Sequence, residues 1–125
     1  MKVIIAGGRD FNDYELLVRK CNKILRNIKD VEVISGKQKT IDKEGNEYGA
    51  DFLGERYAES KGYKIKSFPY LKQYGRAGGP MRNEQMADYA DALIAFWDGG
   101  SRGTADMIER AKSHGLKIRV IKYKK

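Results

Sequence analysis

The sequence has little cysteine, little histidine and no long apolar run, and each scarcity excludes a class of protein. Cys21 and His114 are the only residues of their kinds, so neither an intrachain disulfide nor a Cys/His metal site can form. The apolar run 1–6 is far too short to span a bilayer, and it leads into Gly-Gly-Arg-Asp rather than a small-residue cleavage site. We therefore expect a cytoplasmic protein with no bound metal and no membrane partner.

Two common nucleotide-binding motifs are also missing. No Gly-x-Gly-x-x-Gly fingerprint follows the first apolar run, and no Gly-x-x-x-x-Gly-Lys-Ser/Thr loop occurs anywhere in the chain. The sequence therefore argues against an ordinary dinucleotide dehydrogenase and against a P-loop NTPase.

Positive charge is what the chain has in excess. Its 125 residues carry a formal net charge of +8 and are 41% hydrophobic, which suits one domain, 1–125, with a modest core and an anionic partner. No aromatic residues interleave with its lysine clusters as a nucleic-acid stacking surface requires. We interpret these lysines as a solubilising surface and do not expect nucleic acid as a partner: Lys37, Lys39, Lys43, Lys122, Lys124 and Lys125.

Apolar runs alternate with helical periodicity along the chain. The continuous run 3–6 is typical of a central strand covered on both faces. The pattern predicts strands at 3–6, 31–35, 63–68, 92–97 and 118–121, and helices at 12–28, 51–61, 80–90 and from 103 or 104 to a stop at 115. This alternation predicts an α/β fold, a Rossmann-like three-layer sandwich with a mostly parallel sheet of about five strands.

Particular residues predict the helix ends. Asn12 begins a capping box for the first helix, and Asp51 can cap the second. Gly62 and Gly115 suit the left-handed position that ends a helix. His114 is expected as a cap residue of the last helix, where a partial cation is favourable.

The longest irregular stretch is 36–49, which is polar, charged and aperiodic. Residues 43–46 within it read Lys-Glu-Gly-Asn, which predicts a turn or the tip of a small β-hairpin. A loop of this length inside a compact domain is either mobile or functional.

Four glycine-containing segments, at 7–11, 49–51, 78–83 and 99–104, each precede a predicted helix. In a parallel sheet these turns gather at the carboxyl ends of the strands, where backbone N–H groups and helix N-termini bind phosphate. We expect an anionic, nucleotide-like ligand there. For the last segment the alternative is a plain helix N-cap turn.

The four motifs, in order, are Ala-Gly-Gly-Arg-Asp-Phe at 6–11, Gly-Ala-Asp at 49–51, Gly-Pro-Met-Arg-Asn at 79–83 and Asp-Gly-Gly-Ser-Arg-Gly-Thr at 98–104. Over nearly the whole chain they resemble the YspA/YpsA-related branch of the SLOG superfamily. The resemblance implies a Rossmann-like fold, a nucleotide or nucleotide-derived ligand, no required cofactor, and a bacterial or phage origin. The candidate ligand-binding residues are Gly7, Gly8, Arg9, Asp10, Phe11, Ser35, Gly36, Gly49, Ala50, Asp51, Gly79, Pro80, Arg82, Asn83, Asp98, Gly99, Gly100, Ser101, Gly103 and Thr104.

The chain departs from its SLOG relatives in two places. The resemblance to the LOG phosphoribohydrolases places their catalytic glutamate at Met107, and a thioether cannot activate water. Arg82 matches the arginine of those enzymes. The second departure is an insertion at about 37–48, where the family has a compact glycine turn.

Several side chains have two open interpretations. Arg82, in the first turn of its helix, is either a ligand contact or one half of an ion pair with Asp88, Asp51 or another surface carboxylate. Arg9 and Asp10 either contact the ligand or pair with each other.

The polar and aromatic candidates are open in the same way. Asn83 and Asp98 are candidates for ribose hydroxyls, with a loop backbone the alternative partner of Asn83. Trp97 is either core or a base-stacking surface, and Tyr70 and Tyr74 either stack on a base or pack on the surface.

The motifs and Met107 favour a binding module that senses or sequesters a nucleotide-derived molecule, such as an ADP-ribose derivative. The alternative is a hydrolase of phosphoribohydrolase type with a non-standard acid, for which Asp10, Asp51, Asp98 and Asp106 are candidates. DNA binding by analogy with DprA rests on charge alone.

We also expect a homodimer or higher homo-oligomer, formed by the helix 80–90 and the last helix. Five apolar side chains on these helices are more than one core face needs: Met81, Met86, Tyr89, Met107 and Ile108.

Overall fold

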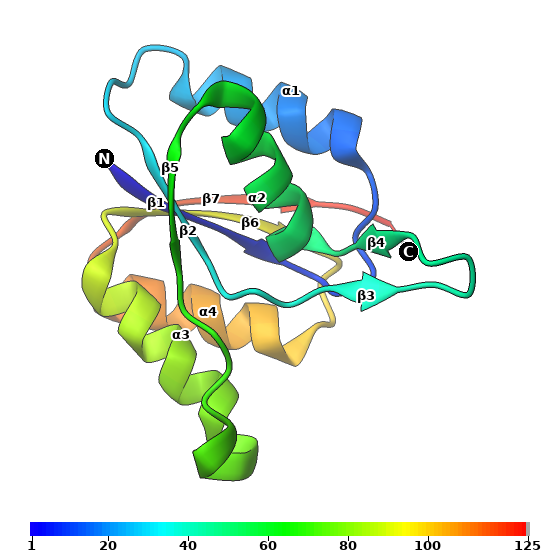
Figure 1. Cartoon of the computed structure of the whole chain (residues 1–125). Helices are drawn as coiled ribbons and strands as arrows, with labels where there is room; N and C mark the ends of the chain where they lie inside the picture. The colour runs from blue at the N-terminus through cyan, green and yellow to red at the C-terminus, as the bar shows by residue number, and fades with distance from the viewer. Residues whose placement is uncertain (125) are drawn as a thin grey trace.

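Five parallel strands form the central sheet, in the order β5-β2-β1-β6-β7 (Figure 1). The structure is a computed structural model that describes residues 1–124. The central position of β1 confirms the prediction from the apolar run 3–6. The strands are β1 (Lys2–Gly7), β2 (Glu32–Ser35), β5 (Lys64–Ser67), β6 (Ala92–Trp97) and β7 (Lys117–Lys122).

Four helices cover the two faces of this sheet. They are α1 (Tyr14–Leu25), α2 (Ala50–Lys61), α3 (Gly78–Tyr89) and α4 (Arg102–Ser113). Helices α1 and α2 lie on one face and α3 and α4 on the other (Figure 1). The predicted three-layer, Rossmann-like sandwich is confirmed. Within residues 1–124 no helix has the length and apolar character needed to cross a membrane.

The core has two halves because successive residues of β1 point to opposite faces of the sheet. Val3 and Ile5 belong to the cluster under α1 and α2, and Ile4 and Ala6 to the cluster under α3 and α4. The second cluster also contains Met86, Met107 and Ile108, none more than 6% exposed. Our interpretation of these three side chains as surplus surface was wrong, because one chain buries them alone.

All four predicted helix starts are wrong by one or two residues, α3 beginning at Gly78 and not at 80. Asp13, not Asn12, caps α1, and its carboxylate accepts from Leu16 N at 3.0 Å. Gly49 is the N-cap of α2, with φ of 113°, and the carboxylate of Asp51 accepts from Gln38 N instead of capping the helix. Ser101 is the N-cap of α4. The predicted ends of α2 and α4 are confirmed, since Gly62 and Gly115 have φ of 72° and 73°. The predicted end of α1 at 28 is wrong, because the helix stops at Leu25.

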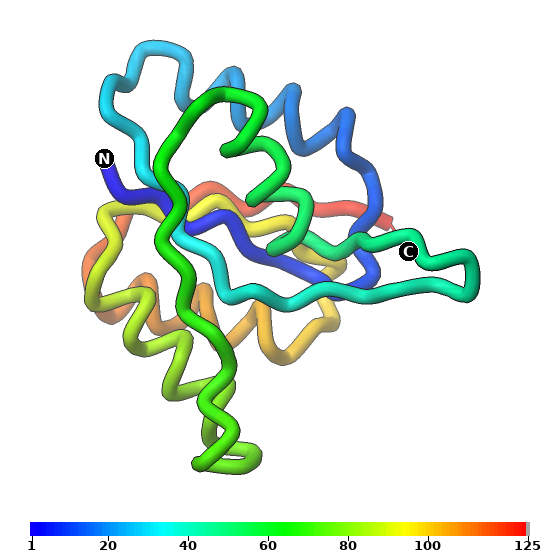
Figure 2. Tube along the Cα trace, viewed as in Figure 1, coloured from blue at the N-terminus to red at the C-terminus, as the bar shows by residue number. Residues whose placement is uncertain are grey.

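The insertion forms an antiparallel hairpin of β3 (Thr40–Ile41) and β4 (Glu47–Tyr48), which confirms the predicted hairpin. It projects from the body of the molecule, and its cyan-to-green trace is clearest in Figure 2. Asp42 closes its tip by accepting from the N–H groups of Glu44 and Asn46 at 3.0 and 2.8 Å. These local bonds lower the pKa of Asp42, the Asn46 backbone bond most of all.

The loop predicted at 69–79 contains a short 3-10 helix, η1 (Lys72–Ala77), and α3 begins directly after it at Gly78. Pro80 lies in the first turn of α3, as predicted, where its missing N–H leaves no bond unmade. Gly78 fits only as glycine, because a Cβ there would lie 2.2 Å from the carbonyl oxygen of Leu71.

Candidate ligand-binding site

A cavity of about 800 Å³ opens beyond the carboxyl ends of β1, β2 and β6. This is the edge of a parallel sheet where ligands bind, and the N-termini of α3 and α4 face the same cavity. The structure thus brings all four glycine segments to one edge. The predicted site residues that line the cavity are Gly7, Gly8, Arg9, Asp10, Gly36, Asp51, Gly79, Pro80, Arg82, Asn83, Asp98, Ser101, Gly103 and Thr104.

Other predicted site residues stand behind this lining. Phe11 is 1% exposed and stacks on Phe96 with ring centroids 4.8 Å apart. The N–H of Gly49 donates to the Phe11 carbonyl at 2.9 Å, and Ser35 donates its hydroxyl to Glu55 at 2.6 Å. These contacts shape the walls of the cavity. The predicted residues outside the lining are Phe11, Ser35, Gly49, Ala50, Gly99 and Gly100.

The loop before α4 is held by its own side chains. Asp98 Oδ1 accepts from the N–H groups of Gly100 and Ser101, both at 2.8 Å. Ser101 Oγ accepts from Thr104 N at 3.4 Å and lies 3.1 Å from the Thr104 hydroxyl. The plain N-cap turn is therefore present, and Asp98 occupies two of the amides that were predicted to bind phosphate.

Two amides at the start of α4 remain open to a ligand. Arg102 and Gly103 occupy the first turn, where N–H groups have no partner within the helix. Both residues line the cavity, and a Cβ at Gly103 would meet no atom within 4 Å. Together with the positive end of the helix dipole, these amides make a site suited to a phosphate oxygen.

Arg82 is a buried cation in the cavity wall, 5% exposed. Its Nη1 donates to the carbonyl of Gly36 at 2.7 Å, and its Nε donates to Asn83 Oδ1 at 3.1 Å. Among residues 1–124 it forms no ion pair with a carboxylate, so neither predicted partner, Asp88 or Asp51, is paired with it. Burial lowers its pKa, although the charge of Asp51 acts in the opposite direction.

Asp51 is a buried anion in the same wall, 7% exposed. Its Oδ2 accepts from the backbone N–H of Gln38 in the insertion at 3.1 Å. Burial raises the pKa of this carboxyl to about 6, although the Gln38 bond and the charge of Arg82 both lower it. A carboxyl with such a pKa changes its charge close to neutral pH.

Gly36 separates these two charges. A Cβ built on it would lie 2.9 Å from Arg82 Nη1 and 2.9 Å from Asp51 Oδ2. Any side chain at position 36 would therefore displace one charged group or both. The requirement for glycine here comes from close packing, because no positive φ is involved.

The first part of the chain matches a known protein family. The family model of the YspA, cpYpsA-related SLOG family matches residues 1–71. The chain belongs to this SLOG family. No curated protein and no solved structure matches the chain. Membership indicates a nucleotide-related ligand-binding or processing role.

The SLOG match contains only part of the cavity. It includes the β1 turn, Gly36 and Asp51, and it ends before α3 and α4 begin. Arg82 and the amides of α4 are therefore placed at the site by the structure, not by the family match.

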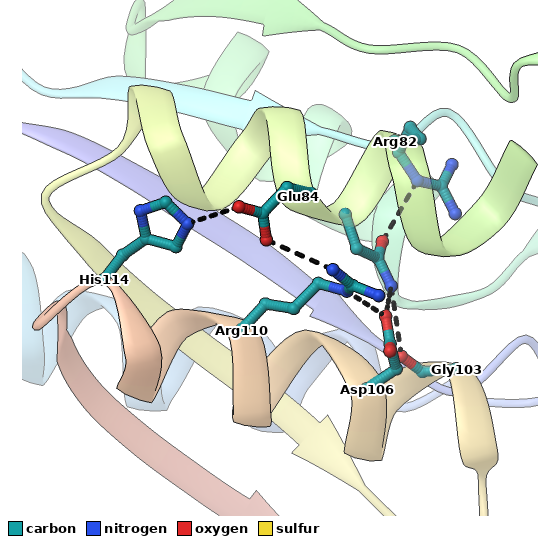
Figure 3. A network of polar contacts seen from close by, with 7 residues as sticks. Arg82, Glu84, Gly103, Asp106, Arg110 and His114 are labelled. Carbon is teal, nitrogen blue, oxygen red and sulfur yellow. Dashed lines mark hydrogen bonds and ion pairs between the residues drawn. The ribbon is translucent and has the colours of Figure 1, made fainter.

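A network of polar contacts joins α3 to α4 in this SLOG domain (Figure 3). Asn83 Nδ2 donates to Asp106 Oδ2 at 2.9 Å and to the Gly103 carbonyl at 3.4 Å. Arg110 Nε donates to the same Asp106 oxygen at 2.9 Å. Since Asn83 also accepts from Arg82, the network fixes the guanidinium relative to α4. Asn83 is thus engaged by α4, through Asp106 and the Gly103 carbonyl, and not by the loop backbone that was its predicted alternative partner.

The far end of the network lies outside the cavity lining. Arg110 Nη1 donates to Glu84 Oε1 at 3.2 Å, and His114 Nε2 lies 2.8 Å from Glu84 Oε2. The hydrogen bonds from His114 and Arg110 lower the pKa of Glu84. His114 is the C-cap residue of α4, which confirms that prediction.

Met107 lines the cavity and is 2% exposed. The position that resembles the LOG catalytic glutamate is therefore at the site, but it carries no group that transfers a proton. Trp97 does not line the cavity. Its indole N–H donates to the Ser101 carbonyl at 3.0 Å, and it packs against the core cluster under α3 and α4.

Lining residues that were not predicted as site residues include Ala6, Gln38, Arg76, Met86 and Arg102. Tyr70, which also lines the cavity, was named only as an alternative. Arg102 lies inside a quoted motif, so its charge beside a helix N-terminus was a usable signal. Gln38 and Arg76 belong to segments whose paths the sequence does not specify. Asp10 also gained an unforeseen partner, since the Tyr123 hydroxyl donates to its Oδ1 at 2.7 Å.

Proposed function

We propose that the chain binds a nucleotide or nucleotide-derived molecule in the cavity, as a sensor or sequestering protein. The observation that carries the proposal is Arg82, a cavity-lining cation that is 95% covered without a carboxylate partner among the described residues. A buried cation that forms no direct ion pair carries a free-energy cost, which the nearby charge of Asp51 reduces only in part. An anionic ligand that pairs with Arg82 lowers this free-energy cost on binding.

The rest of the cavity has the same character. Arg9, Arg76 and Arg102 line it together with Arg82. Two of its carboxylates are engaged by the protein, Asp98 by two amides and Asp106 by Asn83 and Arg110. The charge presented to a ligand is therefore mainly positive, which favours phosphate groups.

Binding without turnover is the favoured form of the proposal because Met107 occupies the place of the expected acid. One observation supports the alternative, a phosphoribohydrolase-type enzyme with a non-standard acid. Asp51 combines a place in the cavity with a pKa of about 6, as a general acid or base requires. Among the four predicted acids it is therefore the strongest candidate.

Mass spectrometry of small molecules released by denaturing the freshly purified protein tests the proposal. We expect a phosphate-containing nucleotide derivative at a stoichiometry near one per binding site. Calorimetric titration with AMP, NAD and ADP-ribose, with chromatography for free base or ribose phosphate, separates the two forms. Stoichiometric binding without product supports a binding module, and turnover supports the enzyme. A chain that carries no such molecule and binds none of these probes would contradict both.

A further inference from the structure

Asp51, the second buried charge of the cavity, has one carboxylate oxygen that the described part of the chain leaves unbonded. Asp51 Oδ2 is occupied by the Gln38 amide, but within residues 1–124 nothing donates a hydrogen bond to Oδ1. No fully covered side-chain oxygen or nitrogen in that part of the chain lacks a partner. The free oxygen of Asp51 is therefore accessible, and the residue that carries it lines the cavity.

A carboxylate in an anion-binding cavity repels phosphate, so the part of the ligand beside Asp51 must donate a hydrogen bond. Asp51 Oδ2 and Arg82 Nη1 lie 2.9 Å from one common point, the Cβ position of Gly36, yet they do not pair. These two atoms are held by Gln38 N–H and Gly36 C=O, so a ligand would use Asp51 Oδ1 as acceptor and the remaining guanidinium N–H groups as donors. The same two neighbouring side chains carry these groups. Sugar hydroxyls satisfy both, because each hydroxyl donates and accepts and two stand on neighbouring carbons.

We propose that Asp51 is the residue that recognises a ribose hydroxyl of the ligand and thereby selects ribonucleotides over deoxyribonucleotides. The proposal rests on the proposed function. Asn83 and Asp98, the residues predicted for ribose, are already bonded within the protein, whereas Asp51 has an oxygen to offer. A hydroxyl that donates to this oxygen replaces the water it loses on burial.

The alternative donor is an exocyclic amine of the base. The position of Asp51 argues against it, because Arg82 and the α4 amides draw phosphate groups into the same wall. The sugar is the part of a nucleotide directly bonded to phosphate, and the base lies one group further away. With a base amine beside Asp51, the sugar would lose Asp51 as an acceptor, and the phosphate would lie further from Arg82 and the α4 amides.

Calorimetric titration at pH 7.5 with AMP, ADP-ribose and their 2′-deoxy and 3′-deoxy counterparts tests the proposal. We expect removal of one of the two hydroxyls to weaken binding by about ten- to hundredfold, the range of a hydrogen bond to a charged group. Asp51→Asn should weaken the parent ligand and lose most of the preference. Glu59→Gln removes an exposed charge about two turns further along α2, outside the cavity lining, and should keep the preference. Thermal unfolding of both variants checks that they are folded.

The failures are distinguishable. Equal affinity for ribose and deoxyribose ligands would overturn the role of Asp51 and leave nucleotide binding intact. A preference for AMP over IMP that Asp51→Asn abolishes, without a hydroxyl preference, would assign Asp51 to the base and also overturn the proposal. If no probe binds, the proposed function fails and this inference fails with it.

Discussion

Asp51 and Arg82 both pack against Gly36. The carboxylate and the guanidinium each come within 2.9 Å of the point where a Gly36 side chain would begin. Both groups are buried in the cavity wall, and each is held by one backbone group, Gln38 N–H for the acid and Gly36 C=O for the base. Small changes at position 36 should therefore affect both charges together.

Gly36→Ala should lower the free energy of unfolding by about 1–3 kcal/mol, because the added methyl group overpacks a buried site. It should also weaken nucleotide binding by moving Arg82. The control is Gly100→Ala, whose Cβ would meet only Asp98 Oδ1 at 3.8 Å and should change stability by less than about 0.5 kcal/mol. Urea unfolding of both variants measures the difference. Equal free energies of unfolding for Gly36→Ala and Gly100→Ala would show that Arg82 and Asp51 can shift to accommodate a methyl group.

Asp51→Asn should raise the free energy of unfolding at pH 7 by roughly 1–3 kcal/mol. The folded pKa of about 6 lies above the ordinary aspartate pKa of 3.8, so the native chain binds more protons than the unfolded chain between these values. This group therefore makes the native protein less stable as pH rises through that window. Asp51→Asn has no titrating group at this position, so its stability does not fall through this window. The difference in free energy of unfolding between the variant and the parent should disappear near pH 4.

Asp42→Asn is the matched control for the Asp51 variant. Local hydrogen bonds lower the pKa of Asp42, so the same substitution should reduce stability at neutral pH. Thermal unfolding from pH 4 to pH 8 should give opposite signs for the two variants. A stabilising Asp42→Asn, or an Asp51→Asn variant with the pH profile of the parent, would contradict the electrostatic account.

ADP-ribose affinity should fall as pH decreases from 7.5 to 5, because protonation of Asp51 removes its negative charge as an acceptor. ADP-ribose is the suitable probe because its phosphates stay ionised in this range, unlike the terminal phosphate of AMP. The charged groups that act on Asp51 are Arg82, Glu55 and Arg9. Titration calorimetry at several pH values should show this dependence for the parent and not for Asp51→Asn. A pH dependence shared by both would assign it to another group.

Arg102→Ala should weaken ADP-ribose binding by about tenfold, as expected for a lost charged contact. Stability should stay the same or rise slightly, since an exposed cation at a helix N-terminus opposes the helix dipole. Arg26→Ala, at the C-cap of α1, makes the same change of net charge outside the cavity lining. If the two variants lose affinity equally, general charge and not the α4 terminus explains the attraction.

The homodimer stays a prediction, with a smaller apolar surface than the sequence suggested. Met81 on α3 is 38% exposed and Tyr74 on η1 is 50% exposed, whereas Met86 and Met107 are core. Sedimentation at micromolar concentration should give twice the monomer mass of 14.2 kDa, and Met81→Glu should shift the chain toward monomer. A native chain that sediments only as a monomer would refute the dimer.

The sequence predicts the strands and helices well because their signals are local. The run 3–6 alternates its side chains between two faces, and Gly62 and Gly115 stop helices at the positions predicted. The hairpin in the insertion was also readable, since its tip is closed by the short-range bonds of Asp42.

The chemistry of the site depends on contacts that sequence spacing does not reveal. Asp51 has the sequence position of a helix cap, yet its carboxylate turns to Gln38 because the hairpin brings that amide to it. Asp98 was predicted for a ligand hydroxyl, yet the tight turn after β6 directs it to two backbone amides. Both outcomes need the path of a loop in space, which glycine and proline positions alone do not specify.

The hairpin has a chemical consequence for a cavity that it mostly lies outside. Its Gln38 amide is the group that lowers the pKa of Asp51 most, ahead of the charge of Arg82. Burial raises the pKa of Asp51, and the Gln38 bond opposes that rise. The base of an external loop thus moderates the acidity of an internal group, so the insertion contributes to the electrostatics of the cavity as well as to the surface.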